Sequence, residues 1–218
     1  MKGEQTALLL GFEPFNGDNV NPSQQIVDAL AGAIVAAHRV AACTLPTEFA
    51  RVVAMTSDLI AKYRPSLVLA VGQAGGRDGI SIERIAVNVI DARVADNAGD
   101  QPVDAPVIDG APNAYFSTLP IKAMLRALQN ARISAEISNT AGTFVCNQVF
   151  YALAHLVATR HPDMRSGFVH VPFLPEQARR HAGAPSMELQ TMIDATRLCL
   201  EVALTTRDDL HFAAGATH

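Results

Sequence analysis

Short, uninterrupted apolar runs that alternate with helix-like segments constrain the fold of this chain most strongly. Residues 6–11 (TALLLG) and 67–71 (LVLAV) are two such runs, and a polar, Gly-containing segment follows each of them. Continuous apolar runs of about four to eight residues are typical of strands that are buried on both faces of a sheet. Because such strands alternate here with helical patterns, the sequence predicts an α/β fold with an open, mostly parallel twisted sheet and helices on both faces.

The expected elements follow from apolar periodicity and from Gly and Pro punctuation. Strands are expected at residues 6–11, 39–45, 67–71, 80–90, 135–138 and 167–171, and helices at residues 23–38, 46–63, 119–131, 145–160 and 187–206. Asn21 and Pro22 suit the start of the first helix, as N-cap and first-turn proline. Residues 80–90 alternate between apolar and polar positions, the period of a half-exposed strand. Residues 91–113 lack periodicity, and a loop of that length usually covers a functional site.

The 218 residues fit one domain, and we expect residues 1–218 to form it, with residues 210–218 as a frayed tail. The formal net charge is −4 and no basic block is present, so nucleic acid is not an expected partner. The longest uncharged stretch, residues 137–156, contains too many Ser, Asn, Thr and Gln residues for a membrane span. We therefore expect a cytoplasmic protein that binds neither nucleic acid nor a membrane.

The cysteine content excludes a disulfide framework and a cysteine-based metal site. The three cysteines, Cys43, Cys146 and Cys199, are far apart, and none shows metal-ligand spacing to a second Cys or His. Cys43 lies in an expected apolar strand and Cys199 in the middle of an expected helix, which favours a packing role for both. Cys146 has different surroundings, because it lies at the start of an expected helix.

Three polar or Gly-rich segments directly follow apolar strands, where the site of an open α/β sheet lies. They are residues 11–23, 72–77 and 138–148. In the third, Cys146 falls in the first turn of a helix, where free backbone N–H groups and the helix dipole favour a thiolate and can hold an oxyanion. A buried structural cysteine is about as compatible with this pattern. No dinucleotide, P-loop, zinc-protease or GxSxG motif is present.

A cysteine nucleophile needs a base and a group that orients the base. His170 is the only histidine at the end of an apolar strand, although a strand-end histidine is commonly structural. Glu83 interrupts an apolar strand just after residues 72–77 and is the best orienting acid, while a solvent-facing role suits it equally. Asp91 and Asp96 are weaker competitors for that role.

Aromatic residues gather in the segments that are expected to surround the site. Phe12, Phe15 and Phe144 lie there and could line a flat apolar pocket, or could simply cap the core. Asn21 taken alone is best explained as a helix cap.

Four blocks of the sequence together resemble the pyroglutamyl peptidase I family, the pyrrolidone-carboxylate peptidases. The blocks are GFEPFNGDNVNPS, VGQAGGRDGISIERIAVNVIDARVADNAGDQP, SNTAGTFVCNQVFYAL and GFVHVPFLPEQ, which span residues 11–177 in the family's order. The resemblance implies a cysteine peptidase with Cys146, His170 and Glu83 as its triad. It also implies a phosphorylase/hydrolase-like α/β fold, no cofactor, no metal and a homo-oligomer, commonly a tetramer.

The substrate that the resemblance implies is a peptide with an N-terminal pyroglutamyl residue, which is removed as free pyroglutamate. By resemblance, Phe12, Phe15, Phe144 and Val145 would enclose the lactam ring, the backbone of Gln73 and the region of Asn21 would bind its amide edge, and Arg93 would support the oxyanion. A neutral, flat, apolar slot suits a lactam that has no free α-amine, provided that Glu13 points outward.

Two other functions remain open from the residues themselves. A nucleoside phosphorylase on a similar scaffold would need an anion site at residues 72–77 and would not need Cys146. A non-catalytic small-molecule binding protein would keep Cys146 as a structural residue that alkylates slowly at neutral pH.

Overall fold

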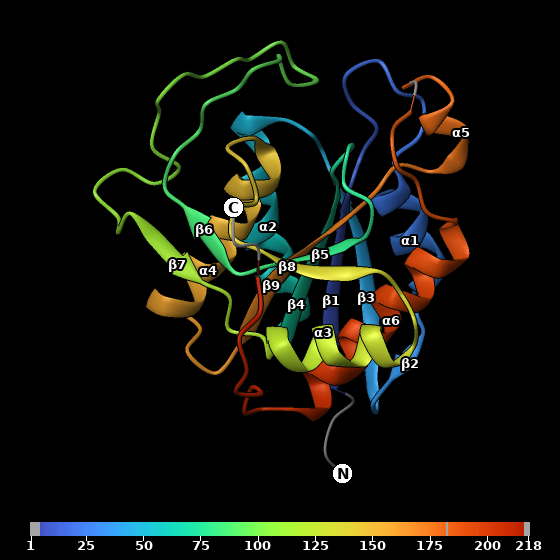
Figure 1. Ribbon diagram of the computed structural model, residues 1–218. Helices are drawn as coiled ribbons and strands as arrows, with labels where there is room; N and C mark the ends of the chain where they lie inside the picture. Colours follow the sequence, from blue (N-terminus) through green and yellow to red (C-terminus); the bar gives the residue numbers. More distant parts are fainter. Residues whose placement is uncertain (1–4, 182, 216–218) are drawn as a thin grey trace.

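The computed structural model describes residues 5–181 and 183–215, which form one layered α/β arrangement (Figure 1). The elements in chain order are β1 (Gln5–Phe12), α1 (Pro22–Leu30), β2 (Ile34–Val35), β3 (His38–Leu45), α2 (Phe49–Tyr63), β4 (Leu67–Gln73), β5 (Ile80–Glu83), β6 (Ile85–Val87), β7 (Ala114–Phe116), α3 (Ile121–Asn130), β8 (Ala135–Ser138), α4 (Val145–Thr159), β9 (Arg165–Val171), α5 (Pro175–Ala178) and α6 (Leu189–Thr205). None of the helices in the described part of the chain combines the length and the apolar character that a membrane span requires.

The main sheet has seven strands in the order β2-β3-β1-β4-β9-β5-β8. β3, β1, β4 and β9 are parallel, whereas β5 runs antiparallel to β9 and β8 runs parallel to β5. β6 and β7 form a separate two-stranded antiparallel sheet. The predicted open, mostly parallel sheet is therefore confirmed, with two short antiparallel additions at its ends.

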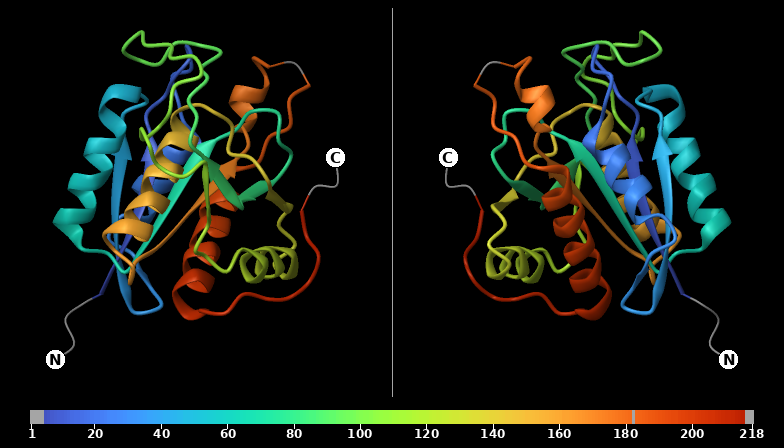
Figure 2. Two further views of the ribbon diagram at one scale, coloured as in Figure 1. Left: turned by 90° about the vertical axis from the view of Figure 1, so that its left-hand side faces the viewer. Right: turned by 90° about the vertical axis from the view of Figure 1, so that its right-hand side faces the viewer.

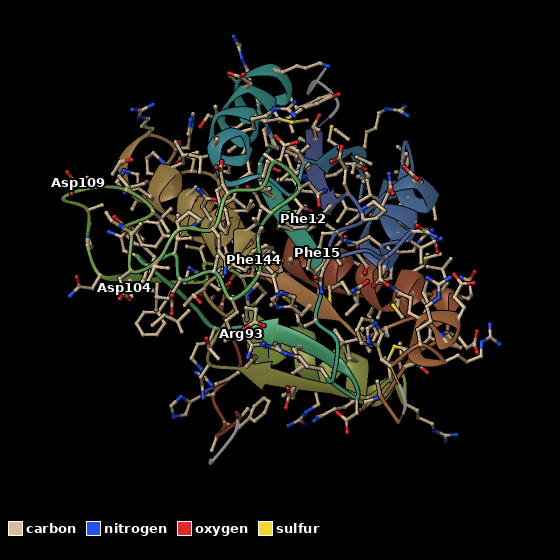
Figure 3. All side chains as sticks on the ribbon, turned by 90° about the horizontal axis from the view of Figure 1, so that it is seen from above. Phe12, Phe15, Arg93, Asp104, Asp109 and Phe144 are labelled. Carbon is tan, nitrogen blue, oxygen red and sulfur yellow. The ribbon has the colours of Figure 1, made fainter. Side chains whose placement is uncertain are left out.

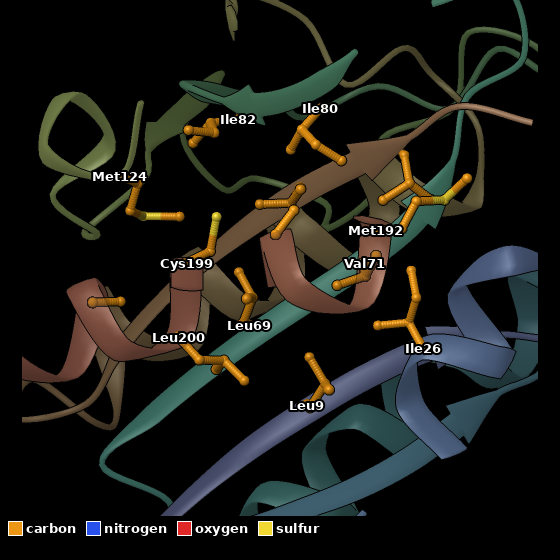
Figure 4. Close-up of a cluster of buried hydrophobic side chains, with 14 of the residues drawn as sticks. Leu9, Ile26, Leu69, Val71, Ile80, Ile82, Met124, Met192, Cys199 and Leu200 are labelled. Carbon is orange, nitrogen blue, oxygen red and sulfur yellow. The ribbon is translucent and has the colours of Figure 1, made fainter. Parts of the chain in front are cut away.

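Helices cover both faces of the sheet, so that its central strands are shielded from water (Figure 2). α1, α3 and α6 pack on one face, and α2 and α4 pack on the other. The apolar run of β4 is buried along its whole length for this reason. On the first face, Leu9 and Leu69 of the sheet meet Cys199 and Leu200 of α6 (Figure 4). Cys199 is fully buried, which agrees with the packing role expected for it.

The first helix is shorter than predicted. Asn21 caps it as expected, because its Oδ1 accepts a hydrogen bond from the Ser23 N–H at 3.0 Å. The helix ends at Leu30, however, and the chain turns through Gly32, which has a φ of +75°. Of the remaining residues of the predicted helix, Ile34 and Val35 form the short strand β2, which pairs antiparallel with β3. The apolar residues near position 34 therefore complete a sheet edge rather than a helical face.

The predicted strand at residues 80–90 is two strands that belong to different sheets. β5 lies between β9 and β8 and is buried at all four positions, not half-exposed. The break falls at Arg84, whose N–H donates to the Ser138 carbonyl and whose carbonyl accepts from the Ser117 N–H. β6 then pairs with β7, an element that the sequence pattern did not predict, and α5 was also missed.

A buried carboxylate anchors the first part of the long segment at residues 91–113. Asp96 Oδ2 accepts the Phe49 N–H at 2.7 Å at the start of α2, and Asp96 Oδ1 accepts the N–H groups of Ala98 and Asp100 at 2.9 Å. Figure 3 shows this segment, which carries Asp104 and Asp109, spread over one end of the molecule. The loop is therefore a fixed part of that end of the sheet.

The C-terminal segment contacts the body of the protein instead of fraying at residue 210. The Asp209 carboxylate accepts N–H groups from the first turn of α3, and Phe212 lies beneath Arg126, with its ring centroid 4.7 Å from the guanidinium carbon. The Ala214 carbonyl accepts a hydrogen bond from Arg84 Nη2 at 2.6 Å. The expectation of a frayed tail is thus wrong for residues 210–215, and residues 216–218 lie outside the described part.

Candidate active site

Cys146 lies where the sequence predicted it, in the first turn of a helix that follows a Gly-containing turn. It is the second residue of α4, and Gly142, with a φ of +78°, allows the turn that leads into the helix. The first N–H groups of an α-helix have no partner within the helix, so they are available to an anion at this point. Gly72 of β4 permits the close approach of the sulfur, because a Cβ at that position would lie 2.8 Å from Cys146 Sγ.

His170 and Glu83, the predicted base and its predicted orienting acid, meet inside the sheet. His170 Nδ1 is 2.7 Å from Glu83 Oε1, and both residues are almost completely buried. In the antiparallel register of β5 and β9, Ser81 is the residue paired with His170. Glu83 lies two residues after Ser81 on the same face of β5, so its side chain reaches His170. The alternative of a solvent-facing Glu83 is therefore wrong. Asp96, a weaker candidate for this role, caps α2 instead.

Cys146 and His170 both line a cavity of about 540 Å³. It is lined by Phe15, Asn16, Gln73, Ala74, Gly75, Arg77, Asp91, Arg93, Val94, Ala141, Gly142, Thr143, Phe144, Cys146 and His170. Among the described residues, Cys146 Sγ makes no hydrogen bond to the imidazole. Catalytic contacts are often longer in a free enzyme than in its complexes.

Two of the predicted aromatic residues form an apolar side of this cavity. Phe15 and Phe144 lie with their ring centroids 5.8 Å apart and their planes tilted by 31°. Phe49 supports Phe144 edge-on from behind, at 5.0 Å. Figure 3 shows Phe15, Phe144 and Arg93 grouped near the middle of this end of the molecule. A flat ligand would find one apolar face here.

Three of the predicted substrate-binding residues do not line the cavity. Phe12 is 2% exposed and packs against Phe168, and Val145 is fully buried. The Asn21 side chain is occupied by the helix cap and by a hydrogen bond from Nδ2 to the Glu13 carbonyl. The alternatives of core packing for Phe12 and helix capping for Asn21 fit these positions. The Glu13 side chain is exposed and is not in the cavity wall, as expected.

The two polar candidates, Gln73 and Arg93, do reach the cavity. Gln73 is 9% exposed, and its Oε1 accepts a hydrogen bond from Gln177 Nε2 at 2.8 Å, which fixes the orientation of the amide. Arg93 is exposed, and its side chain makes no hydrogen bond or ion pair with the described residues. A free guanidinium in the cavity wall can stabilise negative charge that develops on a bound ligand.

Arg77 is a member of the site that the sequence reasoning missed. Its Nη1 lies 2.7 Å from Glu83 Oε1, and its Nη2 donates to the Thr140 carbonyl at 3.0 Å. A signal was present in the sequence, because Arg77 is the one charged residue of the Gly-rich segment 72–77.

The protein environment raises the pKa of the Cys146 thiol to about 12. Burial of the sulfur is the largest cause and the negative charge of Glu83 is the second, while Arg77 and the N–H of Cys146 itself lower the pKa. In the free site these effects together favour the protonated thiol, in the direction opposite to the one expected from the helix terminus alone. We therefore expect removal of the thiol proton to accompany the attack on substrate.

Alkylation of the free protein should show this protonation state. We expect iodoacetamide to modify Cys146 slowly at neutral pH, with a rate that rises about tenfold per pH unit and has no acidic midpoint, because the thiolate is the reactive form. Mass spectrometry of the Cys146 peptide across the pH range measures the rate. A plateau of fast modification below pH 7 would instead show a preformed thiolate. Slow alkylation consequently no longer distinguishes an enzyme from a binding protein.

A model of the protein family described as pyroglutamyl peptidase matches residues 5–206. The chain is 50% identical to the pyrrolidone-carboxylate peptidase of Cupriavidus taiwanensis, over 98% of this chain and 99% of that protein. It is also 50% identical to the pyrrolidone-carboxylate peptidase of Escherichia fergusonii, over 98% of this chain and 100% of that protein.

Solved structures agree with the sequence relatives. The crystal structure of pyroglutamyl peptidase I from Bacillus amyloliquefaciens matches with a TM-score of 0.94 at 40% identity, and the match covers 96% of this chain and 100% of that chain. A mutant pyrrolidone carboxyl peptidase from Pyrococcus furiosus matches with a TM-score of 0.90 at 41% identity, over 92% and 98% of the two chains.

Proposed function

The chain belongs to the pyroglutamyl peptidase family, and from this premise we propose that Cys146, His170 and Glu83 are its catalytic triad. The protein is a cysteine peptidase that hydrolyses the bond after an N-terminal pyroglutamyl residue and releases free pyroglutamate. The observation that carries the triad is that Cys146 and His170 line one cavity, while Glu83 Oε1 lies 2.7 Å from Nδ1 of the imidazole.

The triad divides the reaction into two acyl transfers. In the first, His170 removes the thiol proton as Cys146 Sγ bonds to the pyroglutamyl carbonyl carbon, and the negative charge moves onto the carbonyl oxygen. His170 then gives this proton to the leaving amine, and the C–N bond breaks to leave a thioester. In the second, His170 takes a proton from water, whose oxygen attacks the thioester, and the C–S bond breaks as the proton returns to Sγ.

The start of α4 is placed to hold the negatively charged oxygen. Backbone N–H groups in this first turn supply the donors, and each such donor stabilises a comparable intermediate by about 3–4 kcal/mol. Arg93, which lines the same cavity, would add positive charge to this region. Glu83 holds the imidazole through Nδ1, so that Nε2 faces the reacting groups and the positive charge formed on the ring is stabilised.

The shape and polarity of the cavity suit a lactam ring. Phe15 and Phe144 offer an apolar face, and the Gln73 segment at the end of β4 offers amide partners for the lactam edge. An ordinary charged N-terminus would lose its hydration against the two apolar rings, which offer its ammonium group no hydrogen-bond acceptor. The selectivity for a neutral, cyclised terminus follows from this difference in desolvation.

The family also suggests the substrates, the cofactor requirement and the cellular location of this peptidase. Peptides with an N-terminal pyroglutamyl residue are its substrates, and neither a cofactor nor a metal ion is required for the thiol chemistry described above. Residues 1–218 form a single peptidase domain. By family resemblance the protein works in the cytoplasm as a homo-oligomer, a tetramer in the common case.

A panel of fluorogenic amides tests the substrate class. We expect release of the fluorescent amine from the pyroglutamyl amide and at least about 100-fold lower kcat/KM for the matched glutaminyl and prolyl amides, which carry a charged amine. Equal rates on all three would contradict the lactam pocket. No turnover by folded, reduced protein would contradict the peptidase function, and phosphate-dependent cleavage of a nucleoside would then be assayed.

A further inference from the structure

Arg77 connects the orienting acid of the triad to the turn that carries the nucleophile. Its Nη1 lies 2.7 Å from Glu83 Oε1, the same oxygen that is 2.7 Å from His170 Nδ1. Its Nη2 donates to the carbonyl of Thr140, in the turn between β8 and α4. Resting on the proposed triad, we propose that Arg77 is a positioning residue that holds Glu83 in its His170-facing geometry and ties it to the Cys146 turn.

The burial of Glu83 makes a compensating cation necessary. The side chain is completely buried, and its second oxygen, Oε2, has no hydrogen-bond partner. A buried carboxylate without charge compensation is costly, and His170 offers a full positive charge only when it is protonated. Arg77 carries its charge at every relevant pH and approaches Glu83 from the cavity side, where its side chain is 25% exposed. It therefore offsets the desolvation of Glu83 throughout the catalytic cycle.

The second contact of Arg77 fixes the turn before the nucleophile. The Thr140 carbonyl also accepts a hydrogen bond from Ser138 Oγ at 2.9 Å, and Thr140 Oγ1 accepts the Gly142 N–H at 3.1 Å. The guanidinium thus joins the end of β8, the turn and β5 through one rigid planar group. A lysine at this position would keep the charge but would lose the paired geometry.

Other charged groups near the triad cannot replace this arrangement. Asp91 and Arg93 line the same cavity from the segment after β6, and neither is bonded to Glu83. Arg84 follows Glu83 directly but points elsewhere, to Asn139 Oδ1 and the Ala214 carbonyl. Arg84 is therefore a matched control, since it has the same charge, sits one residue from Glu83 and lies outside the cavity.

Removal of Arg77 should shift the pH profile of catalysis in a predictable direction. A nearby positive charge disfavours protonated forms of its neighbours, and Arg77 lowers the pKa of the Cys146 thiol. In Arg77→Gln, both limbs of the kcat/KM profile should therefore move to higher pH, by about one unit for charges at this separation. A merely structural role would lower the amount of active protein without moving either limb.

The test compares Arg77→Gln, Arg77→Lys and Arg84→Gln in full-length protein with the pyroglutamyl amide. We expect Arg77→Gln to lose about 10- to 100-fold in kcat with KM within about threefold, and to show the shifted limbs. Arg77→Lys should restore the wild-type limbs but only part of kcat. Arg84→Gln should keep the wild-type profile, even if its melting temperature falls.

The outcomes separate this inference from the proposed function. If Arg77→Gln keeps the limbs of the wild-type pH profile and a kcat within threefold of wild type, the proposed role of Arg77 is overturned. It is also overturned if Arg84→Gln shows the shift of the limbs that is expected for Arg77→Gln. Should Arg77→Gln fail to fold, Arg77→Lys decides, because full wild-type kcat in it would overturn the role of the paired geometry. An inactive wild-type protein would instead count against the peptidase function itself.

Discussion

Replacing Cys146 with alanine is expected to abolish hydrolysis of a pyroglutamyl amide, with a loss of at least about 10⁴-fold in kcat. The reason is that no other nucleophile among the described residues of the cavity wall stands beside His170 at the start of a helix. The exchange removes only the sulfur of a half-buried residue, so the fold should survive and pyroglutamate should still bind. Turnover with a fluorogenic amide, far-UV circular dichroism and calorimetric titration with pyroglutamate measure the three quantities.

Cys43→Ala is the matched control for this variant. Cys43 is also half-buried, but it lies on β3 and its sulfur faces the Tyr63 hydroxyl at 4.0 Å, outside the cavity. We expect it to keep wild-type kcat. Substantial turnover in folded Cys146→Ala would retain the activity and remove the thiol mechanism. Loss of activity in both variants would mean that the effect is structural.

The parts of the fold that depend on local burial could be predicted from the sequence. The runs at β1 and β4 are apolar throughout because helices cover both of their faces, and this pattern is visible in the residues. The predicted elements are wrong where contacts between distant parts of the chain determine the secondary structure. Residues 31–37 leave the helix because β3 offers a pairing partner, and residues 80–90 divide because Arg84 stands at the boundary between two sheets.

The candidate site shows the same division between local and distant information. Cys146 and His170 could be placed because the end of a strand and the start of a helix are local signals. The complete burial of Glu83 could not, because it depends on β5 running antiparallel beside β9. Arg77 was missed for a related reason, since its two partners are 6 and 63 residues away along the chain.

Replacing Glu83 should separate its geometric role from its charge. In Glu83→Ala, His170 Nδ1 loses its acceptor in a buried site, and we expect about a 10⁴-fold loss in kcat together with about 3–5 kcal/mol of destabilisation. In Glu83→Gln the amide oxygen can still accept from both His170 and Arg77, so the ring orientation survives while the charge does not. The expected loss in kcat is then smaller, about 10²- to 10³-fold, with about 1–2 kcal/mol of destabilisation. Turnover and urea unfolding of the three proteins measure these differences.

Glu136→Gln provides the control for this series. Glu136 is paired with Ser81 across the β5–β8 ladder, its carboxylate accepts the Ser81 hydroxyl at 3.0 Å, and the residue is exposed outside the cavity. We expect wild-type kcat from this variant. That result would show that neutralising a carboxylate next to β5 does not by itself lower kcat. Equal losses in Glu83→Ala and Glu83→Gln would show that charge alone matters, because the two variants differ in their ability to orient the ring. A fully active Glu83→Ala would remove Glu83 from the triad, and the buried pair with His170 would then be only a structural contact between β5 and β9.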